Sequence, residues 1–395
     1  MEYKNITELA YTYIGLVTTM TKHYVENGVP LIFNSSIKIN GIDLSKPVFL
    51  DYEFAEKNKN RMHRKNDIVT VHTGDIGVSA IIPSELDGSL GFATIVTRIN
   101  NINEILPEYL CAFLNYGGGK EQLYKYSRDA RNNLNLTDYN RLIVPVPDIK
   151  KQEDIVNQIQ KFNKIIENNK QKSILLDELV KARFVEMFGN PFDSARWIVK
   201  KLKDISESMI DGSNVNPDYY ESEGEVLFLR IQNVWRNEFR LEDSVYIPQD
   251  INKEQYYDTS LKTGDLLITK IGRYYTKDSS LGRVSVYRGK DDSANYSNNI
   301  MRVRLKGPMN SEFVNTLLNL DDYQSFIKRT SKGGTDKRAL SKSLIGSYPI
   351  IMPPKESQDE FAEFIKQVDK SKFIIQKQRD ETQKLFDKLM QDYFG

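Results

Sequence analysis

Four clusters of basic side chains indicate where this chain could bind a polyanion. They lie at residues 57–65, 125–133, 270–277 and 328–338, and Arg283 follows the third cluster. Lysine and arginine neutralise phosphates, and arginine can also hydrogen-bond the edge of guanine in the major groove of DNA. Any single run could instead be a solvated surface loop, and the two clusters of the second half together favour DNA contact. The candidate contacts are Lys57, Lys59, Arg61, Arg64, Lys125, Arg128, Arg131, Lys270, Arg273, Tyr274, Lys277, Arg283, Lys328, Arg329, Lys332, Lys337 and Arg338.

The sequence offers no comparable set of residues for catalysis. It lacks the Gly-x-x-x-x-Gly-Lys-Ser/Thr loop of ATP sites, the Gly-x-Gly-x-x-Gly loop of dinucleotide sites and the Asn/Asp-Pro-Pro-Tyr/Phe motif of adenine methyltransferases. The single cysteine, Cys111, excludes a disulfide scaffold, and three histidines argue against a multi-histidine metal site. Asp67 and Asp265 each precede an apolar run, so we interpret them as strand-entry residues rather than as catalytic carboxylates.

The overall composition is that of a globular protein without a strong net charge. Among 395 residues there are 55 basic and 54 acidic side chains, and 39% of the residues are hydrophobic. This balance excludes a histone-like polycation, although local patches matter more than the sum. No apolar run reaches the roughly 18 residues that a membrane-spanning helix needs, and the N-terminus has no signal-peptide pattern. We therefore predict a cytoplasmic protein of two or three domains with no membrane partner.

The elements that must position the basic clusters follow from an internal repeat. Residues 152–189 align without a gap with residues 358–395, and a hydrophobic, proline-bearing stretch precedes each segment. Upstream, residues 66–74 correspond to residues 264–272, and other landmarks keep the same order in both halves. The chain therefore consists of two copies of one module of about 200 residues. The identities in the C-terminal segments are Gln152/Gln358, Ile159/Ile365, Lys164/Lys370, Leu179/Leu385, Phe188/Phe394 and Gly189/Gly395.

Each copy is predicted to contain a globular part of about 150 residues followed by one long helix. Short β-branched runs predict strands, for example at 67–71 and 265–271, and segments near 107–114 and 311–318 predict short helices. Apolar residues at alternating spacings of three and four then predict helices that are free of proline and glycine until their C-terminal ends. The predicted apolar seam comprises Ile155, Ile159, Phe162, Ile166, Leu176, Val180, Phe361, Ile365, Val368, Ile375, Phe386 and Leu389.

Such helices need a partner of their own length. At 1.5 Å per residue each would be about 57 Å long, and a 150-residue globular part cannot bury an apolar stripe of that length. We predict that the two helices pair as an antiparallel coiled coil, since a pseudo-two-fold axis would relate the halves. Alternatively, each helix packs on its own globular part. The predicted fold class is α+β, with two pseudo-symmetric domains of mixed β-sheet and short helices joined by the two long helices.

These features together resemble the specificity subunit of type I restriction–modification systems. The resemblance is carried by the proline-bearing stretches before Gln152-Glu-Asp and Gln358-Asp-Glu, the long helices, the Phe188-Gly-Asn-Pro exit followed by Trp197, and the Gly264-Asp-Leu-Leu turn. It covers the whole chain, and the duplicated order of the motifs is more specific than any one of them. The resemblance implies a non-catalytic subunit that recognises a bipartite sequence in double-stranded DNA.

The resemblance also implies domain limits and partners. Residues 1–148 and 190–352 would be two target recognition domains, each reading one half of the DNA site. Residues 149–189 and 353–395 would be the central and C-terminal conserved helices, which set the spacing and dock two methyltransferase (modification) subunits. Those subunits would methylate adenine with S-adenosylmethionine, and restriction subunits that use ATP and Mg can join, so no cofactor is expected in this chain. The base-contacting residues are the variable part of the family, and the resemblance assigns none.

Other classes of function remain open at this point. A recognition subunit of a related system, whose partner fuses cleavage and methylation, would look the same. The chain could also be a coiled-coil adaptor with two ligand-binding β domains and no nucleic acid, or an enzyme with an unrecognised site. Specific duplex affinity that falls steeply with salt would favour DNA recognition, whereas enzymatic activity of the isolated chain would favour the last alternative.

Overall fold

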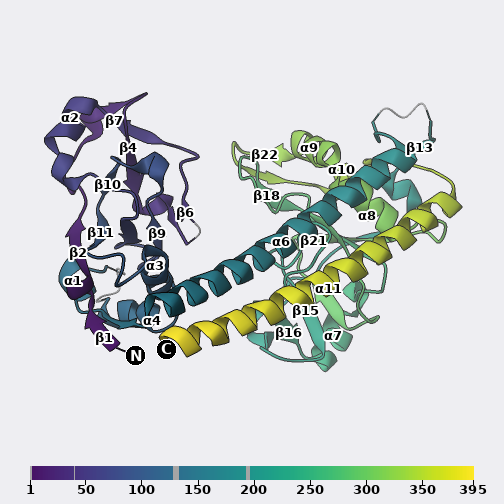
Figure 1. Ribbon diagram of the computed structural model, residues 1–395. Helices are drawn as coiled ribbons and strands as arrows, with labels where there is room; N and C mark the ends of the chain where they lie inside the picture. The colour runs from purple at the N-terminus through teal and green to yellow at the C-terminus, as the bar shows by residue number, and fades with distance from the viewer. Residues whose placement is uncertain (1, 40, 128–132, 193–195) are drawn as a thin grey trace. The chain divides into compact units, whose positions relative to one another are not determined.

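The computed structural model describes residues 2–39, 41–127, 133–192 and 196–395, and the chain divides into two compact units (Figure 1). Unit 1 comprises Met1–Lys170 and Gln376–Gly395, and unit 2 comprises Gln171–Ile375. The boundary between the units therefore falls inside both long helices. Each unit contains one globular part together with part of each helix.

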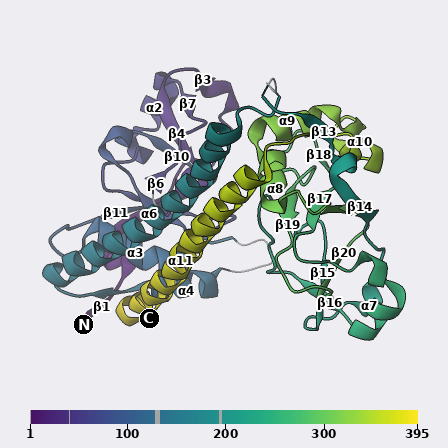
Figure 2. The same ribbon diagram turned by 90° about the vertical axis from the view of Figure 1, so that its right-hand side faces the viewer.

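The two long helices are α6 (Ile149–Phe188) and α11 (Lys355–Phe394), and they lie side by side in Figures 1 and 2. In unit 1, the ring centroids of Phe162 and Phe386 are 5.8 Å apart. In unit 2, Arg183 forms an ion pair with Glu360 at 3.0 Å. Residue numbers rise along α6 as those of their partners fall along α11, so the pairing is antiparallel. This confirms the predicted fold class.

The predicted apolar seam faces inward along both helices. Six of its twelve residues are buried (Ile155, Ile159, Phe361, Ile365, Val368 and Phe386), and the other six are partly buried. The globular parts also cover the helix ends, because Phe184 of α6 stacks on Phe313 at 5.4 Å in the core of unit 2. The helices therefore both pair with each other and pack on the globular parts.

Unit 1 is built from an antiparallel sheet and a mixed sheet. The antiparallel sheet has the order β2 (Ala10–Ile14), β11 (Thr94–Ile99), β8 (Ile68–Val71), β9 (Ser79–Ile81). The mixed sheet has the order β10 (Leu90–Phe92), β4 (Val29–Phe33), β7 (Val48–Leu50), β3 (Tyr24–Val25), with β10 parallel to β4. Two small pairs are β1 (Glu2–Asn5) with β12 (Ile143–Val146) and β5 (Ile37–Lys38) with β6 (Gly41–Ile42). The shorter helices are α1 (Ile6–Leu9), α2 (Tyr52–Lys57), α3 (Pro107–Asn115), α4 (Gly117–Tyr126) and α5 (Leu136–Tyr139).

Unit 2 repeats the order of the antiparallel sheet and has a mixed sheet of three strands, without a counterpart of β3 among the described residues. The antiparallel sheet is β14 (Ser206–Asp211), β21 (Ile300–Leu305), β17 (Leu266–Thr269), β19 (Val284–Val286), and the mixed sheet is β16 (Val245–Ile247), β15 (Val226–Leu229), β20 (Ala294–Tyr296). β13 (Val199–Lys201) pairs with β24 (Pro349–Ile351), as β1 pairs with β12. A further sheet has the order β18 (Ile271–Arg273), β23 (Lys337–Ala339), β22 (Lys332–Gly333). The shorter helices are α7 (Gln249–Gln255), α8 (Ser311–Asn319), α9 (Asp321–Thr330) and α10 (Lys342–Gly346).

Asp67 and Asp265 are structural residues at equivalent strand entries. Asp67 accepts hydrogen bonds from Arg98 at 2.9 and 2.6 Å, and Asp265 accepts them from Arg304 at 2.8 and 2.7 Å. Each aspartate also caps its own turn by accepting a bond from a backbone N–H three residues earlier. Both carboxylates are almost fully buried. Buried charges require such partners, which agrees with the strand-entry interpretation.

A glutamine at the start of each long helix joins the helix to its globular part. Gln152 accepts a bond from the backbone N–H of Leu106 at 2.9 Å and donates to two backbone carbonyls. Gln358 likewise accepts from the N–H of Asn310 at 3.0 Å and donates to the carbonyl of Pro353. Both side chains are buried. The identity of these glutamines across the repeat therefore reflects a shared role in orienting each helix.

Candidate nucleic-acid interface

The sheet of β18, β23 and β22 joins the two basic clusters of the second half. Arg273 of β18 is paired with Lys337 of β23 in antiparallel register, and Lys332 of β22 is paired with Ala339. Figure 1 shows β18 and β22 beside α9, the helix that carries Lys328. We call these strands, with the adjoining residues 270–278 and 328–338, the basic ribbon. Segments that lie far apart in the sequence thus form one surface.

Local backbone requirements explain why these residues form a ribbon. A Cβ at Gly272 would lie 2.3 Å from the backbone nitrogen of Leu281, so glycine lets β18 pass close to that segment. Gly333, at the start of the β22–β23 hairpin, has a φ of 147°, a value that side chains disfavour. The N–H of Leu340 donates to the carbonyl of Lys270 at 2.8 Å and closes the base of the ribbon.

The basic ribbon carries a strong local excess of positive charge. Residues 270–278 and 328–338 contain eight basic and two acidic side chains, in a chain whose total charge is +1. Lys277, Lys332 and Lys337 are exposed and have no ion pair with any residue that the structure describes. Arg329 at the end of α9 is also exposed, and Lys328 is partly exposed. Because no carboxylate of the described residues already neutralises these cations, they are available to bind phosphates.

Other candidates in the ribbon are held by protein contacts. Lys270 forms an ion pair with Asp211 at 2.8 Å. The guanidinium of Arg338 lies 4.9 Å from the ring centroid of Tyr274, a geometry that allows a cation–π interaction. The N–H of Tyr274 donates to the carbonyl of Asp336 at 2.7 Å, which ties the segment after β18 to the hairpin turn.

Arg283 is buried and stabilises the fold beside the ribbon. It is 6% exposed, donates to the carbonyls of Ser279 and Val234, and lies 3.6 Å from the ring centroid of Trp235. Arg240 lies 3.4 Å from the same ring centroid. Burial, followed by the neighbouring positive charges, lowers the pKa of Arg283 to about 10. Its N–H groups are thus directed at the protein rather than at solvent.

The candidate DNA contacts of the first half differ from one another in their exposure and in their protein partners. Lys57 and Lys59 form exposed ion pairs with Glu53 and Glu56, and exposed pairs of this kind are weak. Arg61 donates to the backbone carbonyls of Ile14 and Gly15. Arg64 and Lys125 are exposed. Arg128 and Arg131 lie outside the described residues.

The position in unit 1 that corresponds to the base of the ribbon carries His72 and Asn133. The N–H of Leu134 donates to the carbonyl of His72 at 2.8 Å, as Leu340 does to Lys270 in unit 2. The His72 ring nitrogen Nδ1 is 3.1 Å from Oδ1 of Asn133, and an isolated bridge joins Thr73 to Asn133. The two units thus share the backbone arrangement, with His72 in unit 1 where unit 2 has Lys270.

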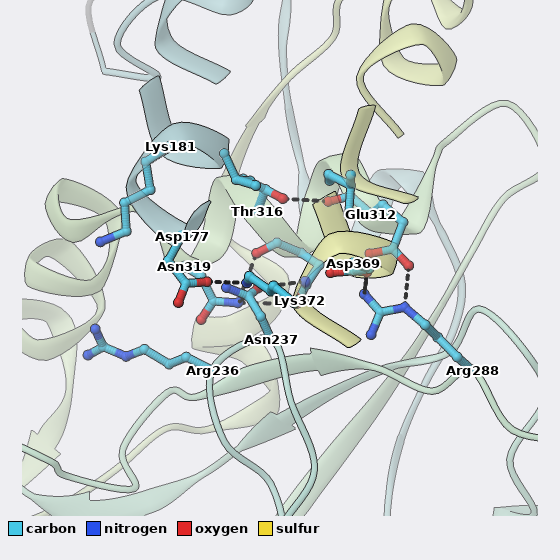
Figure 3. A pocket seen from close by; sticks show the side chains of 13 residues that line it. Asp177, Lys181, Arg236, Asn237, Arg288, Glu312, Thr316, Asn319, Asp369 and Lys372 are labelled. Atoms are coloured by element: carbon cyan, nitrogen blue, oxygen red, sulfur yellow. Dashed lines mark hydrogen bonds and ion pairs between the residues drawn. The ribbon is translucent and has the colours of Figure 1, made fainter. Parts of the chain in front are cut away.

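A cavity of about 260 Å³ in unit 2 is lined by residues of α6, α8 and α11 (Figure 3). Arg288 donates to both carboxylate oxygens of Glu312, at 2.7 and 2.6 Å, and Lys372 forms an ion pair with Asp177. Most of the charged groups around the cavity therefore satisfy one another. The cavity is part of the junction between the helices and the globular part.

The structure places the remaining features of the sequence as follows. Cys111 is buried, and burial raises the pKa of its thiol to about 12. Within the described ranges, no group of three or more His, Cys, Asp or Glu side chains is arranged to hold a metal ion. Among the same residues, no helix is long and apolar enough to cross a membrane.

Comparison with known proteins gives matches along most of the chain. The model of a family described as "Type I restriction modification DNA specificity domain" matches residues 12–177 and 195–383. The type I restriction enzyme EcoBI specificity subunit of Escherichia coli is 29% identical over 140 residues, which are 35% of this chain and 29% of that subunit. A Methanocaldococcus jannaschii protein named as the MjaX specificity subunit is 22% identical over 183 residues, 46% of this chain and 41% of its own length. The matched regions therefore span less than half of both relatives.

Two solved structures share the fold over nearly their full lengths. One is from a study of complex assembly and conformational transition of a type I restriction–modification system, with a TM-score of 0.61, 14% identity, and coverage of 100% of this chain and 97% of that chain. The other is the S subunit from M. genitalium, with a TM-score of 0.54, 13% identity, and coverage of 100% and 96%. At these identities the likeness shows the fold alone.

Proposed function

Because this chain belongs to the family of type I restriction modification DNA specificity domains, we propose that it selects the DNA sequence on which a restriction–modification complex acts. The observation that carries the proposal is the basic ribbon, an antiparallel arrangement with eight basic and two acidic side chains. Such a surface attracts phosphates, and the major groove is wide enough to admit a two-stranded β-ribbon such as the β22–β23 hairpin within it. The duplicated fold supports a target with two half-sites.

In this proposal residues 1–148 and 190–352 are the two target recognition domains. Residues 149–189 and 353–395 form the helices that set the distance between half-sites, about one turn or 34 Å of DNA for neighbouring sites on one face. The proposed contacts of the second domain are Lys270, Arg273, Tyr274, Lys277, Lys328, Arg329, Lys332, Lys337 and Arg338. Arg283 is left out because it is buried. In the first domain, Arg64 and Lys125 are exposed and form no ion pair with any described residue.

We further propose that two methyltransferase subunits dock on the long helices. Leu179 and Leu385 occupy equivalent positions of the repeat, and they are 48% and 61% exposed. Apolar side chains that recur at equivalent exposed positions fit two copies of one partner, since each copy would meet the same residue. Catalysis, with S-adenosylmethionine for methylation and with ATP and Mg for restriction, would belong to the partner subunits. The complex would act in the cytoplasm.

The experiment that tests this function is methylome sequencing of the host with and without the gene. We expect the deletion to remove one bipartite motif with methylated adenines, and a plasmid copy of the gene to restore it. An unchanged set of methylated motifs, in a host whose methyltransferase partner is expressed, would refute the proposal. A coiled-coil adaptor that binds no nucleic acid would give that unchanged result.

A further inference from the structure

Arg273 differs from Arg98, Arg288, Arg304 and Arg338 in where its guanidinium is directed. It is the last residue of β18, and its side chain is 75% exposed. Arg98 and Arg304 each donate two N–H groups to one buried aspartate, and Arg288 donates two N–H groups to Glu312. Arg338 lies over Tyr274. Arg273 thus presents its guanidinium to the surface of the basic ribbon.

One carboxylate lies beside this guanidinium. Oδ2 of Asp336 lies 3.8 Å from Nε of Arg273. The same residue accepts the N–H of Tyr274 through its main-chain carbonyl at 2.7 Å and the N–H of Tyr275 through Oδ1 at 3.4 Å. Asp336 therefore joins the hairpin turn to the end of β18 and lies on the Nε side of Arg273. The two terminal nitrogens form no hydrogen bond with any residue that the structure describes.

A guanidinium with both terminal nitrogens free among the described residues and a carboxylate nearby suits a base edge better than a phosphate. Its planar fork offers two parallel donors, and in the major groove guanine presents two acceptors, O6 and N7, in matching positions. The nearby carboxylate offsets part of the positive charge and so weakens attraction to phosphates. The neighbouring Lys277, Lys332 and Lys337 are point charges without a planar fork, and such side chains are suited to contacts with the DNA backbone.

We infer that Arg273 reads a guanine in the half-site bound by residues 190–352, and that Asp336 is its positioning residue. This inference rests on the proposed function and deepens it, because it divides the basic ribbon into one base-reading side chain and several phosphate-binding lysines. It predicts that the half-site contains a G·C pair at which the preference depends on residue 273. It also predicts that an uncharged residue at position 336 alters specificity without removing a cation.

The test is selection of binding sites from a randomised duplex library by the full chain assembled with its methyltransferase subunits. Wild type should enrich a half-site that contains guanine. Arg273→Ala should reduce the preference for that G·C pair by about 5- to 150-fold and leave the other positions unchanged. Arg273→Lys keeps the charge but loses the fork, so it should show most of the same relaxation. Lys337→Ala, the cross-strand neighbour, is the matched control and should weaken binding to all sequences equally.

Asp336→Asn provides a second readout that a general loss of structure would not mimic. It should relax the same G·C position while affinity for non-specific DNA stays equal or rises, because a negative charge has been removed. The assignment is overturned if the enriched sites lack guanine in that half-site, or if Arg273→Ala and Asp336→Asn retain the wild-type preference. Failure of the wild-type assembly to enrich any sequence would instead refute the proposed function itself, and this inference with it.

Discussion

Removal of three unpaired lysines from the basic ribbon should weaken DNA binding in a salt-dependent way. Lys277, Lys332 and Lys337 are exposed and unpaired among the described residues, so each can neutralise one phosphate. Each phosphate contact contributes about 0.9 to the slope of log K against log salt. Replacement of all three by alanine should therefore reduce the slope by about 2.7. At 0.15 M salt each contact is worth roughly five- to sixfold, so affinity should fall roughly 100- to 200-fold.

The assay is fluorescence anisotropy of a labelled duplex titrated with the full chain and its methyltransferase partners between 0.05 and 0.5 M salt, a range of about one decade. The matched control is Lys253→Ala/Lys262→Ala/Lys290→Ala, which removes three exposed lysines of unit 2 that lie outside the ribbon. Extrapolated to 1 M salt, wild type and ribbon variant should converge. A slope that does not change in the ribbon variant, or that changes equally in the control, would show that this surface faces away from DNA.

Three further outcomes follow from the structure. Burial lowers the pKa of His63 to about 4. Below pH 6.5 the unfolded chain therefore binds a proton at this histidine that the folded chain excludes. The contribution of neutral His63 to folding stability is present above pH 6.5 and is lost as the pH falls towards 4. Denaturant unfolding should show that the free energy of unfolding falls by about 2 kcal/mol between pH 7.5 and pH 5 because of this group. An equal fall in the His63→Asn variant would contradict the assignment to His63. Replacing Gln152 or Gln358 by leucine should cost about 1–3 kcal/mol, because buried backbone groups lose their partners; an unchanged thermal midpoint would argue against the joining role. Leu179→Asp and Leu385→Asp should each weaken capture of a methyltransferase subunit by about tenfold or more while DNA affinity of the free chain stays constant, and unaltered capture by both variants would place the docking surface elsewhere.

The repeat, the long helices and several strands were predictable because their signals are local. Apolar spacing along α6 and α11 reports directly on which side of each helix is buried. The strands expected at 67–71 and 265–271 correspond to β8 and β17, and the short helices near 107–114 and 311–318 correspond to α3 and α8. Each of these elements is specified by residues within a few positions of one another.

The candidate site was predictable only in part, because charge in a sequence does not reveal burial. Lys332 and Arg283 look equivalent as basic residues, but one is exposed and the other is buried against Trp235. The pairing of β18 with β23 joins residues more than 60 positions apart, and short polar strands of this kind carry no periodic pattern. The glutamines at the helix starts were visible as identities, whereas their role required the contacts with Leu106 and Asn310.

The composition of unit 1 from two separate segments has a consequence for how it folds. Its core contains Phe386 and Phe394, which follow the whole of unit 2, Gln171–Ile375, in the sequence. Unit 2 is one continuous segment, so its core can form without any residue of unit 1. Unit 1 in contrast leaves Tyr109 and Phe113 without their partner Phe394 until the second segment has returned to it. A variant truncated before Phe386 should therefore lose protease resistance in its first half and keep it in its second.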